Sequence, residues 1–292
     1  MRKGSTIKVL VVDDYKPWQD SICSMIGTVR GVEVVGRPSD GLEAVRKARE
    51  LQPDLILLDI GLPKLNGIEA ALQIRQLAPK SRILFVSENR SVDIVAAAMA
   101  SGAVGYIVKS NAAKELLPAL QALRCCLTQN DPYVVGGNRR IVYEEIVDAA
   151  VSLMHSDFAS VQMLFPKRGT GGELRLLAFR GFDPSSAKLW EWVRPDTNCT
   201  CGIALRHTRR VVAPDIAAGD LITDLEQRQA YFQAGIRACQ TTPLIARSGD
   251  VVGMISTHWR TPHQCSEDDL RIFDILARGV AEIVEASQQS LS

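Results

Sequence analysis

The sequence predicts a doubly wound parallel α/β domain followed by an α+β domain with an antiparallel sheet. In the first half, five short apolar stretches alternate with five helical patterns over about 125 residues, an alternation typical of a parallel sheet. In the second half, longer apolar stretches are paired around glycine-rich turns, which is typical of antiparallel hairpins.

Length and composition indicate an ordinary globular chain. It has 292 residues, 46% of them hydrophobic and 23% charged, which fits two domains. The net charge of +1 gives no electrostatic case for a nucleic-acid partner. No apolar run approaches the roughly 20 residues that span a bilayer, so no membrane partner is expected. Seven cysteines without framework spacing fit a reducing compartment, so we expect a cytoplasmic protein.

Five apolar stretches are the predicted strands of the parallel sheet. They are residues 7–12, 32–36, 55–58, 82–86 and 104–108. Helices on both faces bury such strands completely, which explains their uniformly apolar character. Right-handed crossovers with strand order 2-1-3-4-5 would put the first and third strands side by side, at the switch point of the sheet.

The intervening helices are predicted from their start signals and apolar spacing. Pro17 suits the first turn of the first helix, and Gly102 suits the end of the fourth. Pro118 is expected to delay or kink the fifth helix. Apolar residues expected to face inward are Leu42, Val45, Ala48 and Leu51 on the second helix, Ile68, Leu72 and Leu77 on the third, and Leu116, Leu120, Leu123 and Leu127 on the fifth.

Polar residues gather where the predicted strands end. Asp13 and Asp14 follow the first strand and Asp59 follows the third, which should be its neighbour. Ser87 and Lys109 follow the fourth and fifth strands and flank the same crevice. Each alone has an ordinary explanation, since an Asp often caps a helix and a strand-end lysine is often solvated. Together, at the ends of four strands, they indicate a functional site.

In order and spacing these residues resemble the receiver domain of two-component response regulators. Further matches are residues 40–44 (DGLEA), Pro63 with Asn66 and Gly67, and residues 102–106 (GAVGY). The resemblance covers residues 5–127, and this segment is similar to receivers that precede a helix-turn-helix domain. It implies a flavodoxin-like (βα)5 fold. Two departures are Ser110, where many receivers have proline, and Gly61, which has no side chain two residues after Asp59.

The three carboxylates would repel one another unless a cation lies among them. Hard oxygen ligands in a partly hydrated site suit Mg²⁺. We expect Asp14, Asp59 and the Gly61 carbonyl to bind the ion directly, and Asp13 to act through water. Asp59 is then the expected phosphoacceptor, which attacks phosphorus and becomes an aspartyl phosphate.

Three further residues have expected roles in the receiver-like half. Lys109 would supply a positive charge to the phosphoryl oxygens, and Ser87 a hydrogen bond. The resemblance implies that Tyr106 turns inward when Ser87 moves, which would change the surface of the fourth helix, fifth strand and fifth helix. The alternative, that Tyr106 is a plain core aromatic, stays open.

In the second half, residues 128–138 have linker composition. Strands are predicted at residues 158–165, 174–179, 211–213, 238–246 and 251–259, and helices from Val142 to Leu153, around residues 189–192 and at 225–234. Residues 199–202 are expected to form a loop, and His155 and His207 to be ordinary helix residues. Ser266 and Asp269 form a capping-box signature that opens a last helix with one apolar stripe.

This half resembles a GAF domain. The supporting residues are Pro243 and Leu244 with Gly249 and Gly253, the helix from Ser266 to Ile283, and the segment 259–263 (WRTPH), which is similar to GAF segments of bacterial sensor kinases. The expected domains are a receiver at 1–127, a linker at 128–138, a GAF-like domain at 139–287 and a tail at 288–292. The resemblance implies a homodimer through the terminal helices, unless their apolar stripes simply cover the sheet.

The cysteines of the second half leave other hypotheses open. Cys199 and Cys201, with Cys239 and Cys265, could bind a metal or an iron–sulfur cluster or act as catalytic thiols, and His258 and His263 raise a similar metal hypothesis. The C-x-C spacing differs from the usual C-x₂-C, and no second close pair exists, so small buried or loop thiols are the simpler interpretation.

These observations predict a response regulator of a phosphorelay rather than a dedicated enzyme. Its partner would be a sensor histidine kinase or phosphotransfer protein, and the GAF-like half would be an output, dimerisation or co-sensing module. No helix-turn-helix, cyclase or kinase segment follows residue 287, so direct transcriptional output is not expected. The alternative is a GAF half that senses an unknown small ligand, a redox signal or a metal, with the receiver as a docking scaffold.

Overall fold

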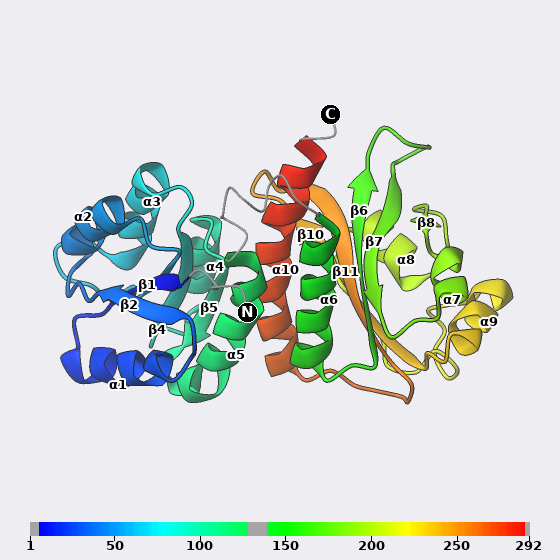
Figure 1. The fold of residues 1–292 in the computed structure, drawn as a ribbon, viewed down its shortest axis with the longest axis horizontal. Coiled ribbons are helices and arrows are strands. Elements are labelled where there is room, and N and C mark those ends of the chain that lie inside the picture. Colours follow the sequence, from blue (N-terminus) through cyan, green and yellow to red (C-terminus); the bar gives the residue numbers. More distant parts are fainter. Residues whose placement is uncertain (1–5, 128–138, 290–292) are drawn as a thin grey trace. The chain divides into compact units, whose positions relative to one another are not determined.

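The computed structural model describes residues 6–127 and 139–289. The chain falls into two compact units, residues 1–131 and 132–292 (Figure 1). The expected linker at 128–138 and the last three residues of the expected tail lie outside the described residues. Within the described ranges, no helix combines the length and the apolar character needed to cross a membrane.

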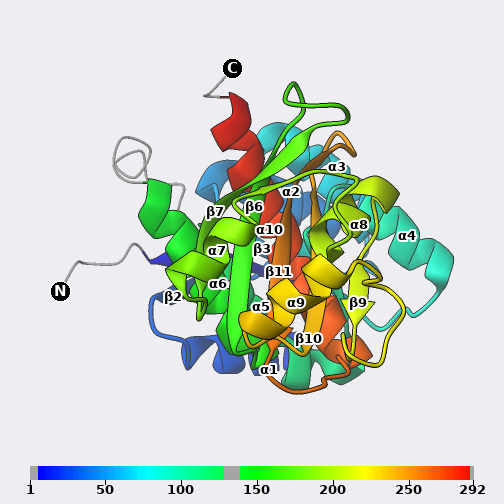
Figure 2. The same ribbon diagram turned by 90° about the vertical axis from the view of Figure 1, so that its right-hand side faces the viewer.

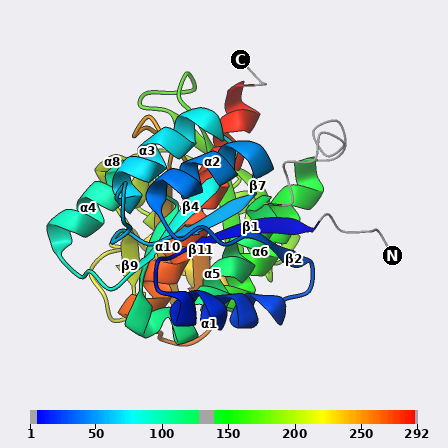
Figure 3. The same ribbon diagram turned by 90° about the vertical axis from the view of Figure 1, so that its left-hand side faces the viewer.

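The first unit is the predicted parallel sheet with strand order β2-β1-β3-β4-β5. Its strands are β1 Ile7–Val12, β2 Val32–Gly36, β3 Leu55–Leu58, β4 Arg82–Ser87 and β5 Gly105–Val108. Its helices are α1 Lys16–Gly27, α2 Gly41–Leu51, α3 Gly67–Leu77, α4 Val92–Ala100 and α5 Ala112–Leu127, with the 3₁₀ turn η1 Lys109–Asn111 before α5. Helices α2, α3 and α4 cover one face of the sheet, and α1 and α5 cover the other (Figures 1 and 3).

The central strand β3 is completely buried. All four of its residues are at most 2% exposed, because helices cover both faces of the sheet. Burial of each such aliphatic side chain contributes about 1.5–3 kcal/mol, so β3 is a rigid support for whatever follows it.

The predicted inward faces of α2 and α3 are partly wrong. Leu42, Leu72 and Leu77 are 53%, 49% and 41% exposed. Val45 and Ala48 are buried as predicted, and most of the other buried positions hold alanines, which let the helices approach the sheet closely. The buried apolar residues are Ala44, Val45 and Ala48 on α2 and Ala70, Ala71 and Ile74 on α3.

The two prolines behave differently. Pro17 lies in the first turn of α1, as predicted, where a missing N–H breaks no helical hydrogen bond. Pro118 lies inside α5, which begins at Ala112 and continues to Leu127, so the predicted late start is wrong. Leu116, Leu120 and Leu123 of this helix are buried, as predicted, and the side chain of Leu127 lies outside the described set.

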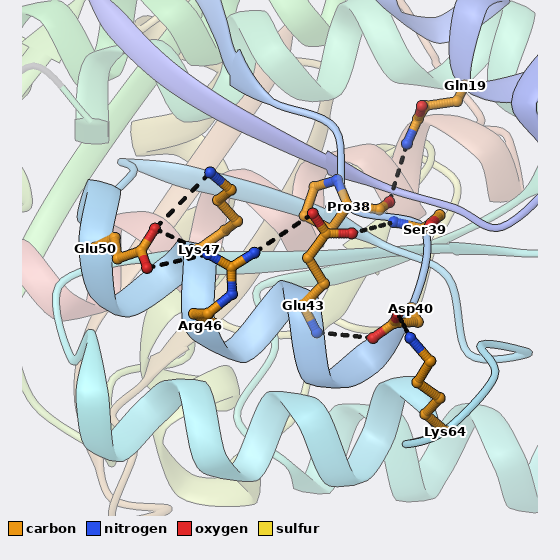
Figure 4. Close-up of polar contacts among 9 residues, drawn as sticks. All are labelled: Gln19, Pro38, Ser39, Asp40, Glu43, Arg46, Lys47, Glu50 and Lys64. Carbon is orange, nitrogen blue, oxygen red and sulfur yellow. Dashed lines mark hydrogen bonds and ion pairs between the residues drawn. The ribbon is translucent and has the colours of Figure 1, made fainter.

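The start of α2 is held by a reciprocal cap, which Figure 4 shows. The Asp40 side chain accepts a hydrogen bond from the Glu43 amide at 2.8 Å, and Glu43 Oε2 accepts one from the Ser39 amide at 3.3 Å. Lys64 pairs with the second oxygen of Asp40. This arrangement fixes the loop between β2 and α2, which packs beside the loop after β1.

The second unit contains a six-stranded antiparallel sheet with order β8-β7-β6-β11-β10-β9. Its strands are β6 Phe158–Phe165, β7 Glu173–Arg180, β8 Trp192–Val193, β9 Val211–Ala213, β10 Ala238–Ile245 and β11 Val251–Trp259. Its helices are α6 Arg139–Met154, α7 Pro184–Leu189, α8 Thr200–His207, α9 Leu225–Gln233 and α10 Glu267–Gln289. Helices α6 and α10 pack on one face of the sheet, and α7, α8 and α9 lie over the other (Figures 1 and 2).

The last helix begins with the predicted capping box. Ser266 Oγ accepts a hydrogen bond from the Asp269 amide at 3.1 Å, and Asp269 Oδ2 accepts one from the Ser266 amide at 3.3 Å. Phe273, Leu276 and Val280 on its apolar stripe are completely buried within this one chain. The stripe therefore covers the sheet, as the simpler of the two sequence interpretations expected.

Three local predictions for this unit are wrong. Residues 200–202 begin α8 instead of forming a loop, because Cys199 caps the helix and its sulfur accepts a hydrogen bond from the Gly202 amide at 3.4 Å. Trp192 lies in β8 rather than in a helix. His155 follows α6 with a φ of 46°, in the left-handed region that ends many helices, so it is not an ordinary helix residue.

Candidate functional site

The predicted acidic residues meet at one edge of the first sheet. Strands β1 and β3 are parallel neighbours with Val12 opposite Leu58, so Asp13 and Asp59 follow them side by side. Asp13, Asp14 and Asp59 each place a carboxylate oxygen within 4.8 Å of the others. Within residues 6–127 and 139–289, no other set of three acidic, histidine or cysteine side chains comes this close together.

Lys109 lies among these acids. Its Nζ is 2.6 Å from Asp13 Oδ2 and 2.8 Å from Asp59 Oδ2, and its side chain is only 9% exposed. It directly follows β5, two strands away from β3, so the sheet topology alone brings it to this position. The centroid of the Trp18 ring lies 5.6 Å from Nζ, within the range of a cation–π interaction.

Backbone amides fix the other oxygens of the two buried acids. Asp13 Oδ1 accepts a hydrogen bond from the Tyr15 amide at 2.9 Å, and Asp59 Oδ1 accepts one from the Ile60 amide at 2.7 Å. Each buried carboxylate thus binds the backbone with one oxygen and Lys109 with the other. Asp14 differs because it is exposed to solvent.

Burial and pairing shift the protonation of this cluster. Burial raises the pKa of Asp13 above its usual value, although hydrogen bonds from Lys109 and the Tyr15 amide oppose this shift. Burial lowers the pKa of Lys109, but its hydrogen bonds to Asp13 and Asp59 outweigh that effect and leave the pKa raised. Lys109 therefore stays charged, and the Asp13 carboxylate would be stabilised by further positive charge.

Ser87 and Tyr106 lie on the neighbouring strands β4 and β5. Ser87 is the buried last residue of β4 and pairs with Val108, the residue before Lys109. The Tyr106 hydroxyl donates a hydrogen bond to the Asn89 carbonyl at 2.7 Å and also interacts with the Ser87 side chain. Burial raises the pKa of Tyr106, so its hydroxyl stays protonated. The two predicted residues thus lie close enough to influence each other.

Two glycines flank Asp59 in different ways. A Cβ added to Gly61 would lie 3.9 Å from Asp59 Oδ2, an ordinary contact distance. A Cβ added to Gly67 would lie only 2.0 Å from the Asp59 carbonyl oxygen, and the Gly67 amide donates to the Ile60 carbonyl at 2.9 Å. Gly67 therefore lets α3 start directly against the segment that carries Asp59.

Gln19 is a supporting residue that the sequence did not reveal. It is 5% exposed, and its Nε2 donates to the Pro38 carbonyl at 3.0 Å, a contact drawn in Figure 4. It also donates to the carbonyls of Val11 at 3.2 Å and Asp13 at 3.4 Å. Its Oε1 accepts a hydrogen bond from Arg37 Nε at 3.2 Å. Gln19 thereby ties the acidic loop to the loop after β2. A glutamine on a helix carries no signal for such a role, which only the packing reveals.

The donor set fits a hard divalent cation. All three side chains offer carboxylate oxygens, which Mg²⁺ prefers, and they converge without a thiol or imidazole. The exposure of Asp14 leaves one side open to water, which Mg²⁺ tends to retain.

The cysteines of the second unit are arranged differently. Cys199, Cys201, Cys239 and Cys265 are all buried free thiols. Among the residues that the structure describes, no three of them converge as a metal-ligand set, alone or with a histidine. His263 stacks on Trp259 with the ring centroids 4.2 Å apart.

Comparison with known proteins gives a match for each unit. A family described as the response regulator receiver domain matches residues 9–121, and one described as the GAF domain matches residues 138–285. The response regulator protein VraR of Staphylococcus aureus (strain Mu3 / ATCC 700698) is 38% identical over 116 residues, which are 40% of this chain and 56% of that protein. The chain thus spans about half the length of the curated relatives it matches.

Two solved structures resemble the first unit. The response regulator domain of Thermotoga maritima CheB is 36% identical, with a TM-score of 0.39, and the match covers 44% of this chain and 99% of that one. A LuxR-family two-component response regulator from Aurantimonas sp. SI85-9A1 is 32% identical, with a TM-score of 0.39, and covers 45% of this chain and 94% of that one.

Proposed function

This chain belongs to the two-component signalling proteins, with a response regulator receiver domain at residues 9–121 and a GAF domain at 138–285, and we propose that Asp59 accepts a phosphoryl group from a partner histidine kinase or phosphotransfer protein. Receiver and GAF domains are typically non-catalytic signalling modules, so the proposed protein is a switch rather than a dedicated enzyme.

One observation carries this proposal. Lys109 bridges Asp13 and Asp59 at 2.6 and 2.8 Å, and Asp14 lies beside them. A buried cation held between two acids costs desolvation energy that a purely structural ion pair seldom recovers. A fixed positive charge beside a carboxylate nucleophile suits phosphoryl transfer, because that reaction depends on positioning and charge neutralisation.

Mg²⁺ is the proposed cofactor, held by Asp13, Asp14 and Asp59 with the Gly61 carbonyl. When bound, the ion would neutralise the acids and coordinate phosphoryl oxygens. The residue set supports this assignment because it contains oxygen donors alone and has a solvent-facing member in Asp14.

In the proposed step, a carboxylate oxygen of Asp59 attacks the phosphorus of a phosphohistidine. The P–O bond to Asp59 forms as the P–N bond breaks, and the leaving imidazole keeps the electron pair and takes a proton from solvent. In the structure, Lys109 donates hydrogen bonds to two carboxylates. After the transfer, it would donate one of these bonds to a phosphoryl oxygen instead. The Ile60 amide holds the Asp59 side chain in a single orientation at 2.7 Å.

The contact between Ser87 and Tyr106 is the proposed readout. A hydrogen bond from Ser87 to the new phosphoryl group would weaken its interaction with Tyr106. Tyr106 would then repack, because only the Asn89 carbonyl would still restrain its hydroxyl. The surface formed by α4, β5 and α5 would change as a result.

The GAF domain is the proposed output or co-sensing module, with a homodimer as its assembled form. The buried stripe of α10 is already used within the chain, so a dimer contact would involve the outer faces of α6 and α10. Ile141 on α6 is 43% exposed and suits such a contact.

Phosphorylation from acetyl phosphate tests the proposal. The protein is incubated with this donor, with and without Mg²⁺, and its intact mass is measured. We expect one added phosphoryl group that requires Mg²⁺ and is lost in Asp59→Asn. Asp54→Asn is the matched control, because Asp54 lies at the opposite end of β3 and binds the Lys8 amide at 2.8 Å. Equal mass gain in Asp59→Asn, or none in the wild type, would refute the assignment.

A further inference from the structure

The GAF unit contains a very small cavity between its sheet and the helices over one face. Its lining includes Phe182, Trp190 and Tyr231 with Ser160, Cys201 and His258. Its volume is about 20 Å³, enough for one or two water-sized molecules, since a single water needs roughly 10–15 Å³. Benzene needs roughly 150 Å³, so an aromatic ligand is too large for the cavity.

His258 gives this cavity an unsatisfied hydrogen-bonding group. The side chain is 4% exposed, and neither ring nitrogen has a hydrogen-bond partner among the described residues. Burial lowers the pKa of His258 to about 3, so the ring is neutral and offers one donor and one acceptor. The buried Trp190 Nε1 also lacks a partner there. A buried polar group without a partner costs free energy, and an occupant that both donates and accepts hydrogen bonds would remove this cost.

Cys201 places a sulfur in the wall of the same cavity. Its Sγ lies 3.5 Å from Ser256 Oγ and 3.9 Å from Thr241 Oγ1. A hydrogen bond from the Cys199 thiol, together with these hydroxyls, outweighs burial and lowers the pKa of Cys201 to about 7. Burial instead raises the pKa of Cys239, which lies in the same polar network 3.1 Å from Thr200 Oγ1. The thiolate is the nucleophilic form of cysteine, so Cys201 is the more reactive of the two.

We propose that Cys201 is a peroxide-reactive thiol whose cavity admits hydrogen peroxide and excludes bulky organic peroxides. Hydrogen peroxide is uncharged, close to water in size, and both donates and accepts hydrogen bonds, as His258 requires. The lining residues include no aspartate, glutamate, lysine or arginine that would favour an ionic ligand.

The reaction has two balanced steps. The Cys201 sulfur attacks one peroxide oxygen as the O–O bond breaks, giving a sulfenic acid, and the other oxygen leaves as water with the proton of the thiol. The Cys199 sulfur then attacks Cys201, the S–O bond breaks, and a second water carries away the Cys199 proton. Sulfur is oxidised and peroxide reduced, and the product is a Cys199–Cys201 disulfide.

Cysteine oxidation can be mapped in the full-length protein. The reduced chain is treated with hydrogen peroxide for set times and then unfolded in urea that contains dimedone, which makes buried sulfenic acids accessible to the trap, and the peptides are analysed by mass spectrometry. We expect Cys201 to be oxidised about tenfold faster than Cys239, because Cys201 lines the cavity that would admit peroxide and Cys239 does not. Cumene hydroperoxide should react at Cys201 far more slowly than hydrogen peroxide.

The variants separate the two sulfurs. Cys199→Ser should accumulate the Cys201 sulfenic acid, because the resolving thiol is missing, whereas Cys239→Ser should behave as the wild type. Cys201→Ser should lose both the adduct and the disulfide. Oxidation of Cys201 no faster than that of Cys239 in the wild type, or equal rates with both peroxides, would overturn the proposal even if a variant fails to fold.

Discussion

The ammonium nitrogen of Lys109 lies 2.8 Å from Oδ2 of Asp59, although 50 residues separate the two in the chain. The parallel sheet creates this contact, since each residue follows a different strand at the same edge. The pair is also nearly inaccessible, with side chains 9% and 8% exposed. Removal of either charge should therefore affect both stability and phosphoryl transfer.

Lys109→Met should destabilise the receiver domain. The buried Asp13 would lose its charged partner, which we expect to lower the free energy of unfolding by about 2 kcal/mol. Mg²⁺ should restore part of this loss because it supplies positive charge to the same acids. Urea unfolding with EDTA and with Mg²⁺ measures both effects.

Lys64→Met is the matched control for that variant. Lys64 also pairs with an aspartate, Asp40, but its side chain is 62% exposed. The lysine end of this pair is solvated and the Glu43 amide still binds Asp40, so unfolding should be nearly unchanged and insensitive to Mg²⁺. A Lys109 variant as stable as this control would contradict the proposed electrostatics.

Gly67→Ala should disturb the site, whereas Gly61→Ala should be tolerated. The methyl group at 67 would meet the Asp59 carbonyl oxygen at 2.0 Å, so the start of α3 must shift, at a cost of about 1–3 kcal/mol or more. The methyl group at 61 meets its nearest atom at 3.9 Å. Thermal unfolding and the rate of phosphorylation by acetyl phosphate should both separate the two variants, and similar behaviour would argue against this packing.

Gln19→Leu should loosen the acidic loop. Three carbonyl groups, those of Val11, Asp13 and Pro38, would lose a shared donor, and we expect a loss of about 1–3 kcal/mol in unfolding free energy. Slower phosphorylation should accompany it because the position of Asp13 depends on this loop. Gln73→Leu on the exposed side of α3 is the control and should change neither quantity.

His258 should make the GAF domain sensitive to acid. The pKa of His258 is about 3 in the folded protein and about 6.5 in the unfolded chain. Below pH 6.5 the unfolded chain therefore binds a proton that the folded protein does not, and the free energy of unfolding falls as the pH falls. Between pH 7 and pH 5 the wild type should lose about 2 kcal/mol more unfolding free energy than His258→Phe. Parallel pH dependence in the two proteins, measured by urea unfolding, would show that His258 is not buried in its neutral form.

Much of the first unit was predictable because its strands are short, uniformly apolar and separated by clear start signals. The acids and Lys109 at the strand ends then follow from topology alone. The inward faces of α2 and α3 were harder to predict. Residues three apart, such as Leu42, Val45 and Ala48, drift by about 60° per step around a helix of 3.6 residues per turn, so such a series does not stay on one face.

Other features had no local signal. Cys199 is an unusual helix cap, so the start of α8 looked like a loop. Gln19 acquires its role only when the loops after β1 and β2 pack together. The cavity around His258 likewise depends on side chains from several elements of the second sheet and its helices. These are tertiary relationships, and periodicity in a single segment does not encode them.

Chemical mapping of the phosphorylated residue is the most direct test of the receiver site. The protein is phosphorylated with acetyl phosphate and Mg²⁺, the acyl phosphate is reduced with borohydride to homoserine, and the peptides are analysed by mass spectrometry. We expect homoserine at position 59 alone, with Asp13 and Asp14 unmodified. Homoserine at Asp13 or Asp14, or none at position 59, would contradict the assignment of Asp59 as the nucleophile.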